Sequence, residues 1–475
     1  MSGQRAANAA TAAAAASGRG SGTTSAGPHR GPKTARQEHV LSATLVLLLA
    51  TVYALAAIVP ARAEDRFQRV APVLFGFDQL EPIGWAAAAL PVLAAVALRL
   101  PWHRLVGRAE ALQAFVEGRS RATRAVLAIG VGVACFGVFF ALRNESLNPD
   151  GAALAAKFQA DVPVKGAHLT HDELLELYVH SRFWAYTNGA FGWSVERSYQ
   201  FLSSAAGAVF VVVLLAFGRS LLGNRRYPIL VLGIASTGFM QLFFGDVENY
   251  TLVTTLILLY LFTAHLYIQE RTNLLVPTTV LAVAICFHLI AAFLLLSLAY
   301  LCLVALRRRE WRPILGAGAV LVAVPLVVAL YFNHHGLPLE SIRTGNAFGQ
   351  AGNIERFAAP NVSYHGQIVS LLFLLFPPVL LFVPLLMYKR IDLTPFNAFL
   401  ASAAGAMAMY MFAWKAQLGV YNDWNLYAPA ILPLAVLFWY NLACAEGLWN
   451  KAGVTAAVVL TSGVHSYAWI VGNHL

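Results

Sequence analysis

Short acidic segments between long apolar stretches hold the residues of this chain that are suited to chemistry. One segment contains Glu145 and continues to Pro149-Asp150-Gly151, a sequence typical of a tight turn. Another, Gly245-Asp246-Val247-Glu248-Asn249-Tyr250, is almost the whole connection between two apolar stretches. Both segments are rich in acidic and other polar side chains. The segments therefore suit binding and chemistry on a polar substrate, either sugar-like or phosphorylated.

Each of these acids also has a purely structural interpretation. Asp150 can be an ordinary turn residue that caps a helix. Asp246 can cap the helix that follows it, while Glu248 interacts with the dipole of the same helix N-terminus. The spacing of the residues leaves both interpretations open.

Three further segments carry candidate residues of this kind. His288 is costly in lipid unless it faces the protein interior, as a satisfied core histidine or as a donor to a phosphate. Arg343 and Arg356 make 333–365 the most basic of these loops, and an ordinary solvated loop is its structural interpretation. Asp423 lies in a polar aromatic segment typical of an anchor at the membrane surface. Its carboxylate can also lie with the other polar residues in one cavity.

The elements that must position these residues are membrane-spanning helices. Of 475 residues, 59% are hydrophobic and only 12% are charged, which is too few charges for a soluble surface. The net charge of +10 comes from short Lys and Arg clusters between apolar stretches, a pattern that argues against nucleic acid as a partner. Because a bilayer core needs roughly 20 apolar residues as a helix, we expect spans at 39–60, 82–100, 124–142, 199–221, 227–244, 249–269, 312–332, 366–388, 394–414, 426–446 and 451–472.

The apolar stretch 274–306 decides the topology. It is too long for one untilted span and too short for two full ones. As one long helix it would separate the basic clusters, whereas a hairpin of short helices turning near His288 puts them all on one face. We therefore expect the hairpin and about 13 crossings. The basic face and the N-terminus are then cytoplasmic, in the plasma (inner) membrane, with the acidic loops outside.

This topology divides an all-α polytopic protein into three parts. Residues 1–37 have few large apolar side chains and predict a disordered cytoplasmic tail. Residues 38–123 hold two N-terminal spans and a cytoplasmic loop, and 124–475 hold the remaining spans. The large outer loop 143–198 mixes apolar, aromatic and charged residues, which predicts amphipathic helices in the membrane interface. The four cysteines have neither disulfide nor metal-ligand spacing.

From 124 to 445 the chain resembles the C-type (GT-C) superfamily of integral membrane glycosyltransferases, which use lipid-phosphate sugars as donors. The resemblance lies in an acidic residue just after a span, Asp150, and in the amphipathic segments 178–184 and 192–204. The second acidic turn, 245–250, and the histidine in an apolar hairpin, His288, are also similar to features of this superfamily. The resemblance implies a GT-C-like catalytic domain with interfacial helices in its first large outer loop.

The resemblance also implies an inverting hexosyl or pentosyl transferase that takes a sugar from a polyprenyl-phosphate-type donor to a glycan, lipid or protein acceptor outside. Asp150 is then the catalytic base toward the acceptor hydroxyl, and basic side chains neutralise the phosphate. Asp246 and Glu248 orient the acceptor or bind a divalent cation, Mg or Mn. The implied substrate-binding residues are Glu145, Asp246, Glu248, Asn249, Tyr250, His288, Arg343, Arg356 and Asp423.

Two other classes of membrane protein remain alternatives. A secondary transporter is expected to carry ionisable residues at mid-membrane and internal repeats with broken helices. The spans here have few charges at their centres and no clear repeat. A lipid-linked glycan flippase, polymerase or ligase without the GT-C fold also gathers polar loops outside, so the sequence separates it poorly from a glycosyltransferase.

Overall fold

The computed structural model describes residues 111, 114–116, 118–145, 149–170, 172–337, 362–382, 392–416, 419–420, 423–444 and 452–474. All of them belong to one compact unit, Thr44–Leu475. Within these ranges the chain forms helices and turns and no strand. The predicted tail, the first two predicted spans, Arg343 and Arg356 lie outside the described residues.

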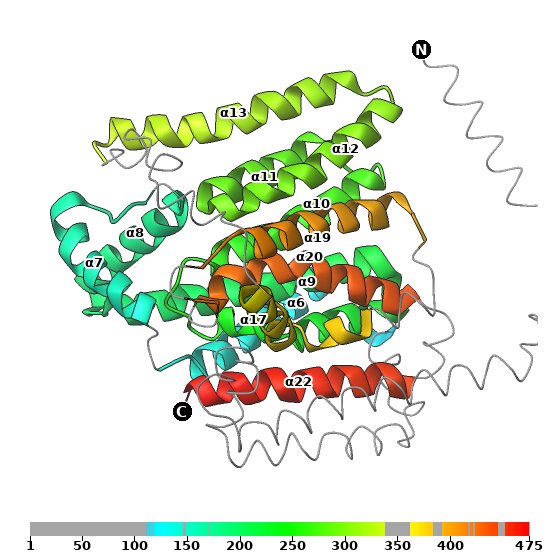
Figure 1. Cartoon of the computed structure of the whole chain (residues 1–475), viewed down its shortest axis with the longest axis horizontal. Coiled ribbons are helices and arrows are strands. Elements are labelled where there is room, and N and C mark those ends of the chain that lie inside the picture. The colour runs from blue at the N-terminus through cyan, green and yellow to red at the C-terminus, as the bar shows by residue number, and fades with distance from the viewer. Residues whose placement is uncertain are drawn as a thin grey trace, which may run out of the picture. The chain divides into compact units, whose positions relative to one another are not determined.

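Long helices run side by side through this part of the chain (Figure 1). Seven apolar segments among the described residues are long enough to cross a membrane, and three shorter ones accompany them. The all-helical membrane fold is therefore confirmed, whereas the total of about 13 crossings stays a prediction. The α-helices are α6 (Arg121–Ala141), α7 (Pro149–Lys165), α8 (Leu174–Phe191), α9 (Val195–Ala235), α10 (Thr251–Ile268), α11 (Leu275–Phe287), α12 (Leu295–Arg307), α13 (Trp311–His334), α17 (Val362–Leu375), α19 (Pro395–Ala413), α20 (Trp424–Cys444) and α22 (Ala452–His474), and the 3-10 helices are η3 (Gly238–Phe243), η4 (Leu289–Leu294) and η5 (Pro377–Leu381).

The predicted span 227–244 is not one continuous helix. After a break at Gly223, where φ is 64°, α9 continues to Ala235, and the chain then tightens into η3. Ser236 and Thr237 stand at this second break, and their hydroxyls donate to carbonyls of the preceding turn at 2.8 and 2.5 Å. Serine and threonine compete in this way with the regular hydrogen bonds of a helix.

The stretch 274–306 forms a hairpin, as the charge pattern predicts. His288 has extended backbone angles (φ −151°, ψ 131°) and interrupts the helix between α11 and η4. Its ring lies 5.0 Å from the ring of Tyr250, which directly precedes α10. At the other end of α10, Arg308 donates to the carbonyl of Ile268 at 2.8 Å. The chain therefore follows α11 to His288 and returns through η4 and α12 along the length of α10.

Two shorter helices, α7 and α8, lie at one end of the long helices (Figure 1) and occupy the predicted outer loop. They share an apolar cluster with the start of α9 and the turn before α10. Phe158 of α7, Leu177 of α8 and Tyr199 of α9 are fully buried in it. Burying a large apolar side chain contributes about 1.5–3 kcal/mol, so this cluster fixes α7 and α8 to the rest of the fold.

The two ends of α10 differ in the charges around them. At its C-terminal end, Arg271 donates to the hydroxyl of Ser220 at 3.0 Å, and Arg308 pairs with Glu270 at 3.5 Å. Its N-terminal end follows the acidic turn that contains Asp246. The arginines that follow α10 and α12 thus lie at the end opposite the acidic turn, and which end faces the cytoplasm stays a prediction.

Gly207 provides a test of the close packing of α9 against its neighbours. A Cβ at this position would lie 2.5 Å from Phe243 Cβ and 2.8 Å from the ring of Phe139. We expect Gly207→Ala to lower the free energy of unfolding by about 1–3 kcal/mol, because the backbones cannot separate without disturbing buried rings. Thermal unfolding in detergent measures the change. Gly130→Ala is the matched control, since nothing lies within 4 Å of a Cβ there; equal melting temperatures for both variants would contradict the prediction.

Candidate functional site

The acidic turn between η3 and α10 is the centre of the candidate site. Asp246 and Asn249 are buried there, with 3% and 2% of their surface exposed. Ser203 of α9 holds the turn by donating to the carbonyl of Asp246 at 2.7 Å. Gly245 has a φ of 71°, and a Cβ there would lie 2.6 Å from the Cβ of Arg143. Glycine is therefore the residue that lets the turn pass so close to the end of α6.

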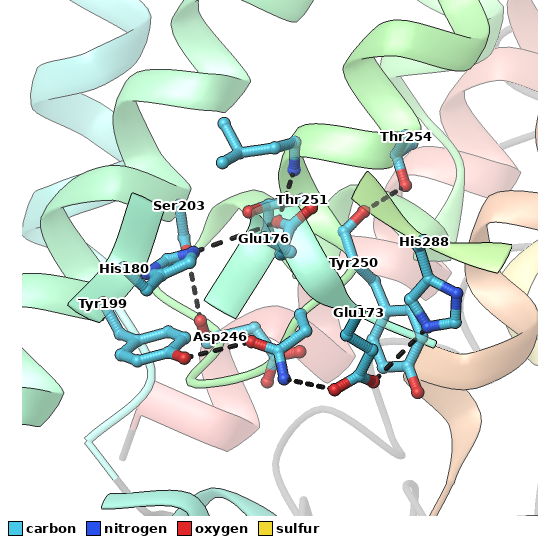
Figure 2. Close-up of polar contacts among 12 residues, drawn as sticks. Glu173, Glu176, His180, Tyr199, Ser203, Asp246, Tyr250, Thr251, Thr254 and His288 are labelled. Atoms are coloured by element: carbon cyan, nitrogen blue, oxygen red, sulfur yellow. Dashed lines mark hydrogen bonds and ion pairs between the residues drawn. The ribbon is translucent and has the colours of Figure 1, made fainter. Parts of the chain in front are cut away.

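A chain of hydrogen bonds connects this turn to Glu173, which precedes α8 (Figure 2). The hydroxyl of Tyr199 donates to Asn249 Oδ1 at 3.0 Å, and Asn249 Nδ2 donates to Glu173 Oε2 at 2.9 Å. The other carboxylate oxygen of Glu173, Oε1, lies 3.4 Å from His288 Nε2. The acidic turn, the start of α8 and the hairpin turn thus meet at one carboxylate.

The hairpin turn is held against the loop before α8. The backbone N–H of Leu289 donates to the carbonyl of Asp172 at 2.8 Å. The N–H of Ile290 donates to His288 Nδ1 at 3.1 Å. Because Nδ1 accepts this hydrogen bond, the neutral ring carries its proton on Nε2, the nitrogen that faces Glu173.

Glu176 and His180 form a second buried pair on α8. Glu176 is fully buried and accepts a hydrogen bond from the backbone N–H of Leu252 at 3.1 Å. His180 stacks on Tyr199 with ring centroids 3.8 Å apart, and its Nε2 lies 3.9 Å from Glu176 Oε1. Burial raises the pKa of Glu176 to about 8 and lowers the pKa of His180 to about 3. At neutral pH, therefore, neither side chain is predominantly charged.

The segment before α20 also reaches the acidic turn. Asn425 Nδ2 lies 3.5 Å from Asp246 Oδ2, and Asp423, two residues earlier, is only 6% exposed. Burial raises the pKa of Asp246 to about 7, although the hydrogen bond from Asn425 lowers it in part. Glu248 is 7% exposed in the same turn. The structure thus gathers several buried carboxyl groups at one end of the long helices.

The structure brings together most, but not all, of the residues that the sequence singles out. The turn residues 246–250, His288 and the Asp423 segment meet, as just described. Glu145 is exposed and pairs with Arg143 at 3.5 Å, and Asp150 is exposed in the first turn of α7. Among the described residues, no hydrogen bond or ion pair joins either acid to the buried turn.

A cation site at Asp246 and Glu248 is not complete in the described residues. No group of three or more His, Cys, Asp or Glu side chains in that part of the chain is placed to hold a metal ion. A divalent cation there would need oxygens from water or substrate for its remaining ligands, because Mg prefers six.

The structure adds residues that the sequence did not single out: Glu173, Glu176, His180 and Tyr199. A weak signal for them was present in the sequence. Glu173, Glu176 and His180 are three and four residues apart, and this spacing puts side chains on one face of a helix. Nothing in the spacing says that this face is turned toward the protein interior.

Long apolar helices with α7 and α8 at one end, beside a buried acidic turn, make up a GT-C-like fold. Two solved structures share it: ArnT from Cupriavidus metallidurans bound to undecaprenyl phosphate, and the same protein in the apo state. Their TM-scores are 0.52 and 0.51, and each comparison has 13% sequence identity and covers 75% of this chain and 77% of the other. At this identity the likeness shows the fold alone. No protein-family model matches the sequence, and no curated protein matches it.

The buried pair on α8 predicts a pH-dependent stability. The pKa of Glu176 is about 8 in the folded protein against an ordinary 4.5, so the folded state holds a proton that the unfolded state has lost. The free energy of unfolding then falls as pH rises, by up to about 1.4 kcal/mol per pH unit between about pH 6 and 8. Glu176→Gln should remove the share of this slope that Glu176 contributes and leave the share that Asp246, whose pKa is about 7, contributes below pH 7. Glutamine stays neutral, and its oxygen still accepts from Leu252.

Thermal unfolding in detergent across this pH range measures the effect. Glu196→Gln, a change at a partly exposed acid in the first turn of α9, is the control that should keep the wild-type slope. Parallel profiles for wild type and Glu176→Gln would show that Glu176 is ionised in the folded protein.

Proposed function

We propose that this protein is a membrane glycosyltransferase that moves a sugar from a polyprenyl-phosphate-type lipid donor to an acceptor on the outer face. The observation that carries the proposal is the buried acidic turn beneath α7 and α8 in a GT-C-like fold. The similar structure of ArnT contains undecaprenyl phosphate, which supports a lipid-linked donor. The acceptor is a glycan, a lipid or a protein.

In the proposed reaction the acceptor hydroxyl attacks the anomeric carbon of the donor sugar. The bond from that carbon to the acceptor oxygen forms as its bond to the phosphate oxygen breaks, and the lipid phosphate leaves with the electron pair. The configuration at the carbon is inverted. A carboxylate takes the proton of the acceptor, and Asp150 is the proposed base because it is an exposed acid beside the end of a span.

The other proposed roles follow the charge of each group. Arg343 and Arg356 neutralise the phosphate that leaves, since guanidinium groups bind phosphate through two parallel hydrogen bonds. Asp246 and Glu248 orient the acceptor, and they are the proposed ligands for Mg or Mn. No step of the reaction is assigned to a cation.

Asp150→Asn tests the proposed base. We expect sugar transfer from polyprenyl-phosphate donors to fall about 10²–10⁴-fold at equal expression, the usual contribution of a general base. Membranes that contain each variant, supplied with a panel of such donors, provide the assay. Asp161→Asn is the control on the same helix, where the acid pairs with Lys165 at 2.8 Å, and it should transfer as the wild type does.

Two other results would change the assignment. Normal transfer by Asp150→Asn would remove Asp150 as the base. If wild type transfers nothing from any such donor, a secondary transporter becomes the better proposal, and the broken helices around Ser236 and His288 fit that class.

Cysteine labelling tests which end of the helices lies outside. Lys165 of α7 is 52% exposed at the acidic end, and Arg307 is exposed at the basic end. With the native cysteines changed to serine, a membrane-impermeant maleimide should label Lys165→Cys on intact cells and Arg307→Cys only after the membrane is opened. The reverse pattern would place the site in the cytoplasm and refute an outer reaction.

A further inference from the structure

Glu173 and His288 face each other without completing a hydrogen bond. Glu173 Oε1 and His288 Nε2 are 3.4 Å apart, and Nε2 has no hydrogen-bond partner within the described residues. Only 7% of the His288 side chain is exposed, against 17% of Glu173. A buried N–H group normally finds a partner, because leaving it unpaired loses the hydrogen bond that water provided.

The remaining polar atoms of both side chains are already engaged. His288 Nδ1 accepts from the N–H of Ile290 at 3.1 Å, so the proton of the neutral ring lies on Nε2. Glu173 Oε2 accepts from Asn249 at 2.9 Å. One donor, Nε2–H, and one acceptor, Oε1, are therefore left side by side, 3.4 Å apart.

This pair of atoms selects the chemistry of its ligand. A hydroxyl group can accept from Nε2–H and donate to Oε1 at the same time, and it is uncharged. A phosphate matches this pair poorly, because the carboxylate oxygen Oε1 repels a second anion. The ring of Tyr250 lies 5.0 Å from that of His288 and adds an aromatic wall beside the pair.

We propose that Glu173 and His288 together bind one hydroxyl group of a sugar substrate. The hydroxyl oxygen accepts from His288 Nε2–H, and the hydroxyl proton is donated to Glu173 Oε1. This subsite holds an uncharged, hydroxyl-bearing part of the substrate and is separate from the place of the phosphate. It rests on the proposed function, and the proton transfer of that function stays with Asp150.

Two substitutions of His288 test the roles of its two ring nitrogens separately. In His288→Asn the side-chain oxygen still accepts from Ile290, but the donor toward Glu173 is lost. In His288→Gln the amide nitrogen reaches the place of Nε2 and keeps a donor there. We expect kcat/KM for transfer to fall roughly 2–10-fold in His288→Asn, the effect of a hydrogen bond between uncharged groups, and to remain near wild type in His288→Gln.

Glu173→Gln should cause a similar loss, and the double variant Glu173→Gln/His288→Asn should lose little more, because one hydroxyl needs both partners. Glu196→Gln is the control, an acid at the same end of the fold that should transfer as wild type does. Normal transfer by both Glu173→Gln and His288→Asn would overturn the subsite.

Deoxy analogues then show which molecule supplies the hydroxyl. Polyprenyl-phosphate sugars and acceptors lacking one hydroxyl at a time are compared on wild type and on Glu173→Gln. The analogue that lacks the bound hydroxyl should lose activity on wild type and lose nothing further on the variant. A donor analogue with this behaviour assigns the subsite to the donor sugar, and an acceptor analogue assigns it to the acceptor. Equal losses on both proteins for every analogue would refute the proposal.

A binding measurement separates this proposal from the proposed function. Methyl glycosides at high concentration should raise the melting temperature of the purified wild type in detergent but not that of Glu173→Gln. If wild type transfers no sugar yet shows this shift, the subsite stands and the transferase proposal fails. If transfer is absent and no glycoside shifts the melting temperature, both are refuted.

Discussion

The cap that Glu176 places on the first turn of α10 is the interaction on which the rest of the site depends. The N-terminus of a helix leaves backbone N–H groups without partners, and Tyr250, the residue before α10, supplies no side-chain cap. Glu176 supplies it from another helix through the N–H of Leu252. Because this hydrogen bond fixes α8, Glu173, one helical turn earlier, contacts Asn249. His180, one helical turn later, stacks on Tyr199.

This arrangement separates the groups that hold the fold from the groups that we propose to meet a substrate. Glu176 and His180 are fully buried and close to neutral, so they add little field to the site. Glu173 keeps part of its surface exposed and receives the hydrogen bond of Asn249. A carboxylate oriented by buried donors is pre-organised, and it need not lose side-chain entropy when a ligand binds.

The sequence predicted the helical membrane fold, the hairpin at His288 and the polar turn at Asp246, because apolar length and the side of the basic clusters are properties of the chain itself. The buried role of Glu176 could not be predicted, since its neighbours on α8 do not show which face is covered. The break at Ser236 could not be predicted either, because a serine inside an apolar stretch is compatible with a regular helix. Packing then selects the hydrogen bond from its hydroxyl to the carbonyl of the preceding turn. Asp150 stood out by its turn motif, yet it lies exposed in α7, apart from the buried network.

The hairpin has a consequence for how the chain enters the membrane. The helix α11 has 13 residues, about 20 Å of helix, and this is shorter than the hydrocarbon core of about 30 Å. Alone it would leave His288 and the open backbone of the turn in lipid, where unpaired polar groups are costly. The partners of that turn, Asp172 and Glu173, are synthesised long before it. During biogenesis, α11 and α12 must therefore leave the insertion machinery together and settle at once against segments already in place.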